Sequence, residues 1–488
     1  MTARAPGESW RERLARGFFS TVLRLGTPLY LLRLMRRGRA EPLYRAHLPE
    51  RFGFGLDVAP GAVWVHAVSL GETRAAAPLV ERLRQARPGL RLLLTHTTAT
   101  GREAGQALLR PGDVQRWLPF DTPGAVRRFL HGTQPAVGVL METEIWPNLQ
   151  QAAVQAGVPM VLANARLSAR SLRRGERFKW LLAPAARTLR LALAQTQEDA
   201  QRLTQAGVPE VQVCGNLKFD LQPDEALLAQ GRSWRERLGR PVVMLAVSRE
   251  GEEAALLARW AAINANPGSD DSGPQPRSQP QTQTQSVTHP LPGAVSPSVL
   301  HPHAPAHLAS SEAQRPLLLI VPRHPQRFDE VAALVQQSGL SLIRRSGFSS
   351  DGPSAEGASA DVWLGDSMRE MALYYGLSDV ALLGGSFEPL GGQNLIEAAA
   401  CGVPLLMGPH TFNFAEAAAL SLEAGAARRV ETLDQAVTEA MALLADPARR
   451  AGMAAAATTF AAAHRGAAQR MADRILALLP SSGPATAA

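Results

Sequence analysis

Residues 380–397, VALLGGSFEPLGGQNLIE, form the most informative pattern in this sequence. The apolar run Val380–Leu383 is typical of a buried strand, and the alanine-rich stretch beyond residue 397 is typical of a helix. Glycines let a ligand approach the backbone closely, and free N–H groups at a helix start attract anions. We therefore expect the strand to end at Gly384–Gly385 and the helix to start near Gly392, where Glu397 could accept hydrogen bonds from sugar hydroxyls. The pattern indicates a nucleotide-sugar site.

Apolar runs alternate with helix-forming stretches on both sides of this pattern. One series lies at 62–68, 90–95, 136–141, 158–163 and 189–194, and a second at 241–247, 316–321, 361–364, 379–383 and 403–407. This alternation predicts parallel sheets with helices on both faces. We expect an α/β protein with two doubly wound domains that face a cleft, in which ligands bind beyond the carboxyl ends of the strands.

The predicted domain boundaries follow the two series. Residues 1–50 form a basic, apolar helical segment, 51–214 the first domain, 215–240 a hinge and 241–488 the second domain. Residues 266–315 interrupt the second series and are rich in Pro, Gln, Ser, Thr and His. They offer few apolar side chains to offset the entropy of ordering, so we predict a disordered insertion there.

The charge and cysteine content restrict the class of protein. The formal net charge is +8, and the first 50 residues hold ten arginines against four glutamates. Aromatic residues are only 5% of the chain, whereas nucleic-acid binders more often combine a basic face with aromatic side chains. Cys214 and Cys401 cannot form a disulfide framework, which is typical of a reducing compartment. We expect no nucleic-acid partner.

The N-terminal segment has the composition of a membrane-associated helix. Residues 18–35 read FFSTVLRLGTPLYLLRLM, with arginines on both flanks. A spanning helix needs about 20 mostly apolar residues, and this stretch is shorter and contains Arg24, Gly26 and Pro28. No small-residue cleavage pattern follows it. A helix lying on an anionic membrane surface fits best; the alternatives are a helix docked on its own domain and a single span.

Carboxylates follow two strands of the first series. Glu72 ends the stretch Ser69-Leu-Gly-Glu72, where it could act as a general base. The same spacing is that of a capping box, and the two interpretations are compatible. Glu142 and Glu144 follow the run 136–141, before a predicted helix start at Pro147. These carboxylates are candidates for catalysis.

Two cationic residues are further candidates for the site, one at the junction of the two series and one directly after an apolar run. Lys218, one of only two lysines in the chain, lies at the junction of the two series. Its compact charge could offset negative charge on a leaving phosphate, or it could be a solvated hinge residue. Arg323 follows the run 316–321 and could bind phosphate, or it could be a surface arginine. The segment Gly365–Met371 by itself is only a helix-capping signal. The motifs GxGxxG, GK[ST], GxSxG, HExxH and CxxC are absent from the sequence.

Six segments in this order resemble the 3-deoxy-D-manno-octulosonic acid (Kdo) transferases of Gram-negative bacteria. They are His66–Glu72 (HAVSLGE), Met141–Asn148 (METEIWPN), Ala163–Arg170 (ANARLSAR), Gly215–Asp220 (GNLKFD), Pro322–Pro325 (PRHP) and Gly402–Phe414 (GVPLLMGPHTFNF). The resemblance implies a GT-B fold of two Rossmann-like domains. It also implies an inverting transfer of Kdo from CMP-Kdo to a lipid A precursor, without a metal or other cofactor, at the cytoplasmic face of the inner membrane.

The resemblance further implies roles for individual residues. Glu72 would be the catalytic base, and Glu142 and Lys218 would stabilise the transition state. The CMP-contacting positions would be Pro322, Arg323, Met368, Arg369, Glu370, Asn394, Leu395, Ile396 and Glu397. We expect the phosphate near Gly385, Ser386 and Arg323. The family commonly has Gly, His and Pro where this chain has Arg369, Gln393 and Leu395, so contacts there would be mostly through the backbone.

Two other functions remain open at this point. A GT-B transferase or epimerase could use a different nucleotide sugar through the same glycine turn. A membrane-recruited scaffold with a vestigial nucleotide fold would show no turnover with any donor and no penalty for changing Glu72, Glu142 or Lys218.

Overall fold

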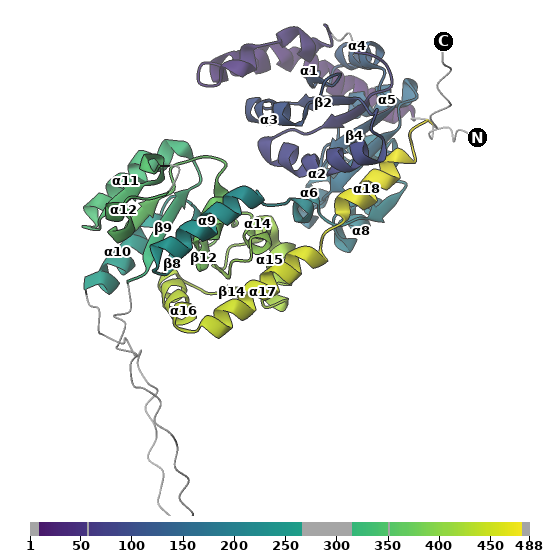
Figure 1. The fold of residues 1–488 in the computed structure, drawn as a ribbon. Helices are drawn as coiled ribbons and strands as arrows, with labels where there is room; N and C mark the ends of the chain where they lie inside the picture. The colour runs from purple at the N-terminus through teal and green to yellow at the C-terminus, as the bar shows by residue number, and fades with distance from the viewer. Residues whose placement is uncertain (1–8, 56–57, 266–314, 350–351, 481–488) are drawn as a thin grey trace, which may run out of the picture. The chain divides into compact units, whose positions relative to one another are not determined.

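The chain folds into two compact units (Figure 1). The computed structural model describes residues 9–55, 58–265, 315–349 and 352–480. One unit consists of residues 1–223 and 458–488, and the other of residues 224–457. The predicted insertion 266–315 lies, apart from Arg315, outside the described residues.

The first unit is built on a seven-stranded parallel sheet. Its strand order is β3 (Val114–Trp117), β2 (Leu92–His96), β1 (Val63–His66), β4 (Val137–Met141), β5 (Met160–Ala165), β6 (Leu191–Ala194) and β7 (Val211–Val213). This is the doubly wound order, in which ligands bind beyond the carboxyl ends of the strands. The central strands β1, β4 and β5 are buried along their whole length, as expected for a sheet covered on both faces.

Helices cover both faces of this sheet. The helices of this unit are α1 (Trp10–Arg37), α2 (Leu70–Ala86), α3 (Ala99–Gly105), α4 (Pro123–Thr133), α5 (Pro147–Gln155), α6 (Ala169–Glu176), α7 (Lys179–Arg187), α8 (Gln197–Gln205) and α18 (Ala467–Leu476), with short 3-10 turns η1 (Pro42–Arg45), η2 (Leu48–Phe52), η3 (Gln106–Leu108) and η4 (Leu217–Asp220). Alternate strand residues enter two separate cores: Trp64 packs with Phe129, while Val63 and Val65 pack on the other face with Leu79.

The N-terminal segment is one helix, α1. Ser9 caps it, and Glu12 completes the capping box. One side of α1 packs on α5 and α7, where buried Ser20 donates a hydrogen bond to Asn148 at 2.9 Å. Within the described ranges, no helix has both the length and the apolar character needed to cross a membrane.

The last helix differs from the predicted domain boundaries. We expected residues 241–488 to form one domain, but α18 belongs to the first unit and packs on α2. Its apolar face, including Met471 and Ile475, is buried in the same core as Leu79. The predicted hinge 215–240 is also divided, because η4 belongs to the first unit and α9 (Glu225–Leu238) to the second. The core contacts, which lie far apart in sequence, decide these boundaries.

The second unit contains another seven-stranded parallel sheet. The order is β10 (Leu342–Arg344), β11 (Val362–Leu364), β9 (Leu317–Pro322), β8 (Val242–Ser248), β12 (Val380–Leu383), β13 (Leu405–Met407) and β14 (Ala427–Arg429). The helices are α9, α10 (Glu252–Ala265), α11 (Phe328–Gln337), α12 (Ala355–Ser359), α13 (Met371–Leu377), α14 (Leu395–Ala400), α15 (Ala415–Glu423), α16 (Leu433–Ala445) and the first part of α17 (Pro447–Ala463), with η5 (Pro325–Arg327), η6 (Arg345–Gly347) and η7 (Phe412–Phe414). The boundary between the units falls within α17, at Thr458. The second doubly wound fold is thus confirmed.

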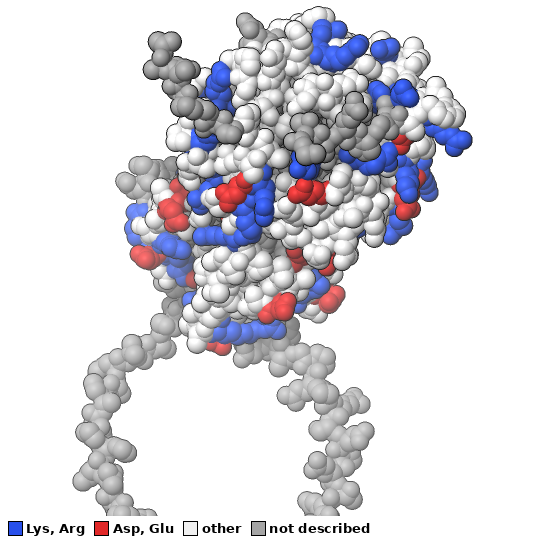
Figure 2. All heavy atoms as spheres, turned by 90° about the vertical axis from the view of Figure 1, so that its right-hand side faces the viewer, with Lys and Arg blue, Asp and Glu red and all other residues white. Residues whose placement is uncertain are grey.

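The surface charge is dispersed on the face drawn in Figure 2. Lys and Arg side chains occur there in separate groups, divided by uncharged areas and by Asp and Glu. A continuous basic stripe, which is typical of nucleic-acid binders, is not visible on that face.

Candidate active site

Glu72 lies in the first turn of α2, just beyond the carboxyl end of β1. Its Oε2 accepts a hydrogen bond from the Val68 amide at 2.8 Å, and the Ser69 hydroxyl donates to Oε1 at 3.2 Å. Ser69 also caps α2. The carboxylate therefore has the local bonding of a helix cap, and it retains lone pairs for a further donor.

The surroundings of Glu72 favour its protonated form. Burial raises the pKa of Glu72 from its ordinary 4.5 to about 7, against the Val68 hydrogen bond, and nearby Glu142 and Glu144 raise it further. Burial likewise raises the pKa of Glu144. A carboxylate with a pKa near neutrality is well suited to general-base catalysis. The structure brings together the three carboxylates that the sequence singled out.

Glu142 has a strained backbone. It directly follows β4 with φ = 59°, a left-handed conformation that non-glycine residues rarely adopt. Its amide donates to the Ala163 carbonyl at 2.9 Å, and its carbonyl accepts from the Arg166 amide at 3.3 Å. Neighbouring strand β5 therefore imposes the conformation. Strain of this kind is concentrated at functional sites.

Lys218 lies on η4, which packs against α2, the helix that carries Glu72. The Leu217 amide donates to Asn164 Oδ1 at 3.0 Å. Gln195 links the carbonyl of Asn164 (2.9 Å) to the side chain of Asn216 (3.0 Å). This amide network orders the turn at the carboxyl edge of the first sheet and thereby positions Lys218.

The second unit places the other predicted residues at its own carboxyl edge. Pro322 is the last residue of β9, and the exposed Arg323 follows it. The Arg323 amide donates to the Ser248 carbonyl at 3.1 Å, which ties this turn to the end of β8. Burial lowers the pKa of His324, and the positive charges of Arg323 and Arg249 lower it further. Cations thus gather at the ends of β8 and β9.

The glycine turn after β12 approaches β8 closely. A Cβ atom on Gly384 would lie 2.4 Å from the carbonyl oxygen of Val247, so only glycine fits there. Gly385 has φ = 69°. The predicted strand end at the two glycines is confirmed, and the following helix α14 starts at Leu395, three residues after Gly392.

The internal bonds of this turn correct the predicted phosphate cradle. The Gly385 amide donates to both oxygens of Glu252, at 2.7 and 2.8 Å. The fully buried Ser386 hydroxyl donates to the Leu383 carbonyl and accepts from the Gly408 amide at 2.8 Å. Because a carboxylate of the protein takes the amide, we do not assign phosphate contacts to Gly385 N–H or Ser386 Oγ.

Met368, Arg369 and Glu370 lie between β11 and α13. Met368 is 54% exposed, so its side chain is available to a ligand. Arg369 has φ = 69°, which explains physically why glycine suits this position. The Glu370 carboxylate accepts hydrogen bonds from Arg345 Nη2, at 2.9 Å, and from Ser367 Oγ. It is thus engaged in holding the turn.

The predicted contacts at α14 divide into two kinds. Leu395 and Ile396 are buried in the core, so only their backbone can reach a ligand. Asn394 and Glu397 are both partly exposed as residues. The side-chain oxygen Oδ1 of Asn394, however, is buried and has no hydrogen-bond partner among the described residues. An acceptor in this state is suited to a ligand donor.

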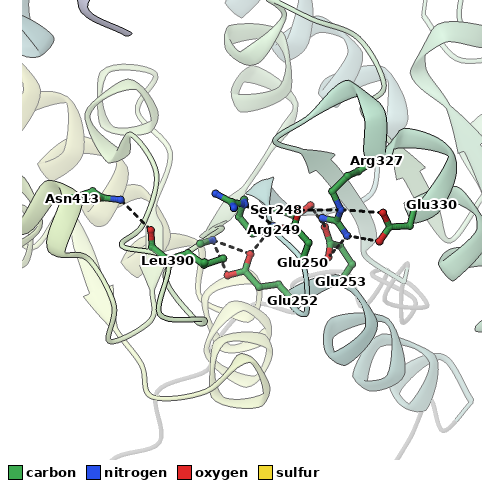
Figure 3. Close-up of polar contacts among 10 residues, drawn as sticks. Ser248, Arg249, Glu250, Glu252, Glu253, Arg327, Glu330, Leu390 and Asn413 are labelled. Carbon is green, nitrogen blue, oxygen red and sulfur yellow. Dashed lines mark hydrogen bonds and ion pairs between the residues drawn. The ribbon is translucent and has the colours of Figure 1, made fainter. Parts of the chain in front are cut away.

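Three residues of the second unit were missed by sequence reasoning: Arg249, Glu252 and Glu253. All three directly follow the apolar run 241–247, as the recognised motifs follow theirs, and that position was the available signal. Figure 3 shows Glu252 directed toward the loop after β12 and Glu253 toward Arg327. Among the described residues, no group of three or more His, Cys, Asp and Glu side chains is arranged to hold a metal ion.

The chain is similar to known proteins along almost its full length. A family described as "3-Deoxy-D-manno-octulosonic-acid transferase (kdotransferase)" matches residues 46–221. The 3-deoxy-D-manno-octulosonic acid transferase of Bordetella pertussis is 44% identical over 95% of this chain and 99% of its own. That of Haemophilus influenzae is 32% identical over 94% of this chain and 97% of its own.

A solved structure supports the fold. The UDP-GlcNAc 2-epimerase of Neisseria meningitidis aligns with 85% of this chain and 100% of its own, at 14% identity and a TM-score of 0.52. At this identity the likeness concerns the fold alone, and it agrees with the predicted GT-B fold. The identity to the curated relatives along almost the full length decides the family: this chain belongs to the 3-deoxy-D-manno-octulosonic acid (Kdo) transferases, which are glycosyltransferases of lipopolysaccharide core biosynthesis.

Proposed function

We propose that the chain transfers Kdo from CMP-Kdo to a hydroxyl of a lipid A precursor, with inversion and with Glu72 as general base. The observation that carries the base assignment is the Glu72 carboxylate at the carboxyl edge of the first sheet, with a pKa of about 7. Family membership supports the donor and the acceptor. A different nucleotide sugar is not favoured, because the epimerase likeness concerns the fold alone.

The proposed step balances without a redox partner. Glu72 takes the proton of the acceptor hydroxyl as the oxygen attacks the anomeric carbon of Kdo. The bond from that carbon to the phosphate oxygen breaks, and its electron pair leaves on CMP. The products are the Kdo glycoside and CMP, with the proton on Glu72. No step in this proposal requires a metal ion.

Two further residues of the first unit stabilise the charges that develop in the transition state of the proposed reaction. Lys218 offsets the negative charge that develops on the departing phosphate. Glu142 stabilises the positive charge that develops at the anomeric centre, and its backbone hydrogen bonds to Ala163 and Arg166 hold it in position. In the second unit, Pro322, Arg323, Met368, Asn394 and Glu397 are the proposed donor contacts.

The acceptor is a lipid, so the proposal also includes a membrane surface, the cytoplasmic face of the inner membrane. Large apolar side chains recur every three or four residues on the exposed side of α1: Trp10, Leu14, Phe18, Val22, Leu25, Leu29 and Leu32. Arginines interleave with them in the sequence. An exposed apolar stripe with basic neighbours is suited to an anionic bilayer surface.

The test is transfer by purified protein, with CMP-Kdo and a lipid A precursor, followed by mass spectrometry of the lipid. Glu72→Gln should lose at least about a hundredfold in turnover and should still be stabilised thermally by CMP. Ser69→Ala is the matched control, because it removes the cap at α2 and one hydrogen bond to Glu72 but keeps the carboxylate itself. Equal losses in the two variants would mean that Glu72 acts only as a cap. Stabilisation by UDP in place of CMP would contradict the donor.

A further inference from the structure

The end of β8 is distorted beside the glycine turn. The register between β8 and β9 shifts between Ala246 and Ser248, and Val247 between them has φ = 60°. A β-branched residue in this conformation is strained. The following loop, Ser248–Gly251, lies against the turns after β9 and β12, because the Ser248 carbonyl accepts the Arg323 amide and Gly251 lies beside Glu388. These two turns hold several of the proposed donor contacts.

Two adjacent buried carboxylates hold this loop in place. Glu252 is 0% exposed and Glu253 1% exposed, both at the start of α10. Glu252 accepts the single Gly385 amide as described and also accepts the Arg249 amide at 2.9 Å. Glu253 accepts from Arg327 at 2.6 Å and from Ser248 Oγ at 2.7 Å. The three loops that follow β8, β9 and β12 are therefore held together through α10 (Figure 3).

Arg249 lies between the turn after β9 and the turn after β12, which both carry proposed donor contacts. A Cβ atom on Gly385 would lie 3.5 Å from Arg249 Cγ and 3.1 Å from Gln393 Nε2, so the side chains of Arg249 and Gln393 both lie against Gly385. On its other side, Arg249 is close enough to lower the pKa of His324, next to Arg323. The guanidinium Nε is 3.2 Å from the exposed Glu250 carboxylate, a pair that water screens.

An anionic donor needs a positive partner at this place. The Gly385 amide, which would otherwise attract an anion, is occupied by Glu252. The same Glu252 carboxylate accepts the backbone amide of Arg249. The positively charged side chain of Arg249 is 26% exposed. A guanidinium on an ordered loop loses little freedom when it pairs with phosphate or carboxylate.

We propose that Arg249 is a donor-binding residue whose guanidinium pairs with an anionic group of the sugar nucleotide, either the CMP phosphate or the carboxylate of the sugar acid. The inference rests on the proposed function and names a residue beyond those that the family resemblance supplied. Arg323 reaches the donor from the β9 side and Arg249 from the β8 side.

The test compares three ligands with Arg249→Gln and Arg249→Lys. The first measurement is the Kd of CMP and of cytidine, which lacks the phosphate, and the second is the KM of CMP-Kdo. If the phosphate is the partner, Arg249→Gln should raise the Kd of CMP by about 10- to 100-fold and leave the Kd of cytidine unchanged. If the sugar carboxylate is the partner, CMP binding stays as in the wild type and the KM of CMP-Kdo rises by a similar factor. Arg249→Lys should recover part of either loss.

Arg235→Gln is the matched control. Arg235 has a similar exposure, 22%, and pairs with Asp379 at 2.6 Å, beside the amino end of β8. It should lower thermal stability and leave ligand binding unchanged. Wild-type values of both the CMP Kd and the CMP-Kdo KM in Arg249→Gln would overturn the inference, with the proposed function intact. A wild-type protein that neither binds CMP nor uses CMP-Kdo would overturn both.

Discussion

The side chain of Asp220 accepts hydrogen bonds from the amides of Gly466, at 2.6 Å, and Ala468, at 2.8 Å. A residue two positions after Lys218 therefore caps α18, which follows almost 250 residues later in the chain. The cap complements the macrodipole of α18 and fixes the turn that carries Lys218. The Asp220 carboxylate thus joins the last helix to the turn that carries Lys218, and we expect the docking of α18 to be coupled to that turn.

Removal of this cap should destabilise the first unit. Asp220→Ala leaves two helical amides without a partner, so the free energy of unfolding should fall by about 1–2 kcal/mol. Hydrogen exchange of residues 467–476 should accelerate more than that of β4. Asp220→Asn is the control, because it retains one acceptor and should lose less. Unchanged exchange in α18 would contradict the coupling.

The pH profile should reveal the base and its neighbours. Glu72 must be ionised to accept a proton, so kcat/KM should fall as the pH drops below about 7, the pKa of Glu72. Glu144 raises that pKa, so Glu144→Gln should lower it and move the acidic limb of the profile to lower pH. Exposed Glu81 on the same helix provides the control, Glu81→Gln, with an unshifted limb. If the acidic limb of the Glu144→Gln profile stays at the wild-type pH, Glu144 does not influence the pKa of Glu72.

Arg369→Gly should stabilise the second unit. The left-handed backbone of Arg369, φ = 69°, costs a non-glycine residue about 1–2 kcal/mol, and the added flexibility of glycine in the unfolded chain cancels part of the gain. The net gain should be about 0.5–1 kcal/mol in denaturant unfolding. Arg369→Ala separates backbone from side chain, because it keeps the Cβ atom and should bring no gain. Equal stabilisation by both variants would mean that the side chain is the unfavourable part.

The buried ion pair of Glu253 and Arg327 should contribute more to the free energy of unfolding than the exposed pair of Glu330 and Arg327. Glu253 and Arg327 are 1% and 8% exposed, and loss of one partner leaves an uncompensated buried charge. Glu253→Gln should therefore cost about 3 kcal/mol in the free energy of unfolding. Glu330→Gln removes a 57% exposed partner of the same arginine and should cost less than about 1 kcal/mol. Similar costs would show that Arg327 does not depend on the buried carboxylate.

The exposed face of α1 should be needed for membrane binding. Leu25 and Leu29 are 75% and 73% exposed, and replacement of both by Asp should weaken binding to anionic vesicles by about 100-fold in co-sedimentation. Phe412→Asp changes an exposed apolar residue of the other unit and should bind as the wild type does. If the double variant still sediments with vesicles, α1 is not the anchoring surface.

The central strands could be predicted, whereas the edges of both sheets could not. Every predicted apolar run corresponds to a strand, because central parallel strands are buried on both faces. The missed strands β3, β7, β10 and β14 are the edge strands of the two sheets. Residues of β7 and β10 are half-buried or exposed, so they lack the continuous apolar run. Such strands are decided by pairing with a neighbour that lies far away in sequence.

The site could be predicted only in part, for a similar reason. Glu72, Glu142 and Arg323 follow apolar runs, and a parallel sheet necessarily brings such positions to one edge. The occupation of the Gly385 amide by Glu252 depends on a contact across 133 residues, and the local pattern of neither residue contains it.

The sequence by itself determined the two parallel sheets, the strand ends that carry the polar residues and the family. Short-range patterns of apolar, glycine and polar residues specify which strands are buried and where turns form. Only the tertiary structure decided that α18 belongs to the first unit and that Glu252 takes the glycine amide. It also decided that Arg249 lies between the two proposed donor turns. These features depend on which surfaces pack together, and packing joins residues whose separation along the chain leaves no local signal.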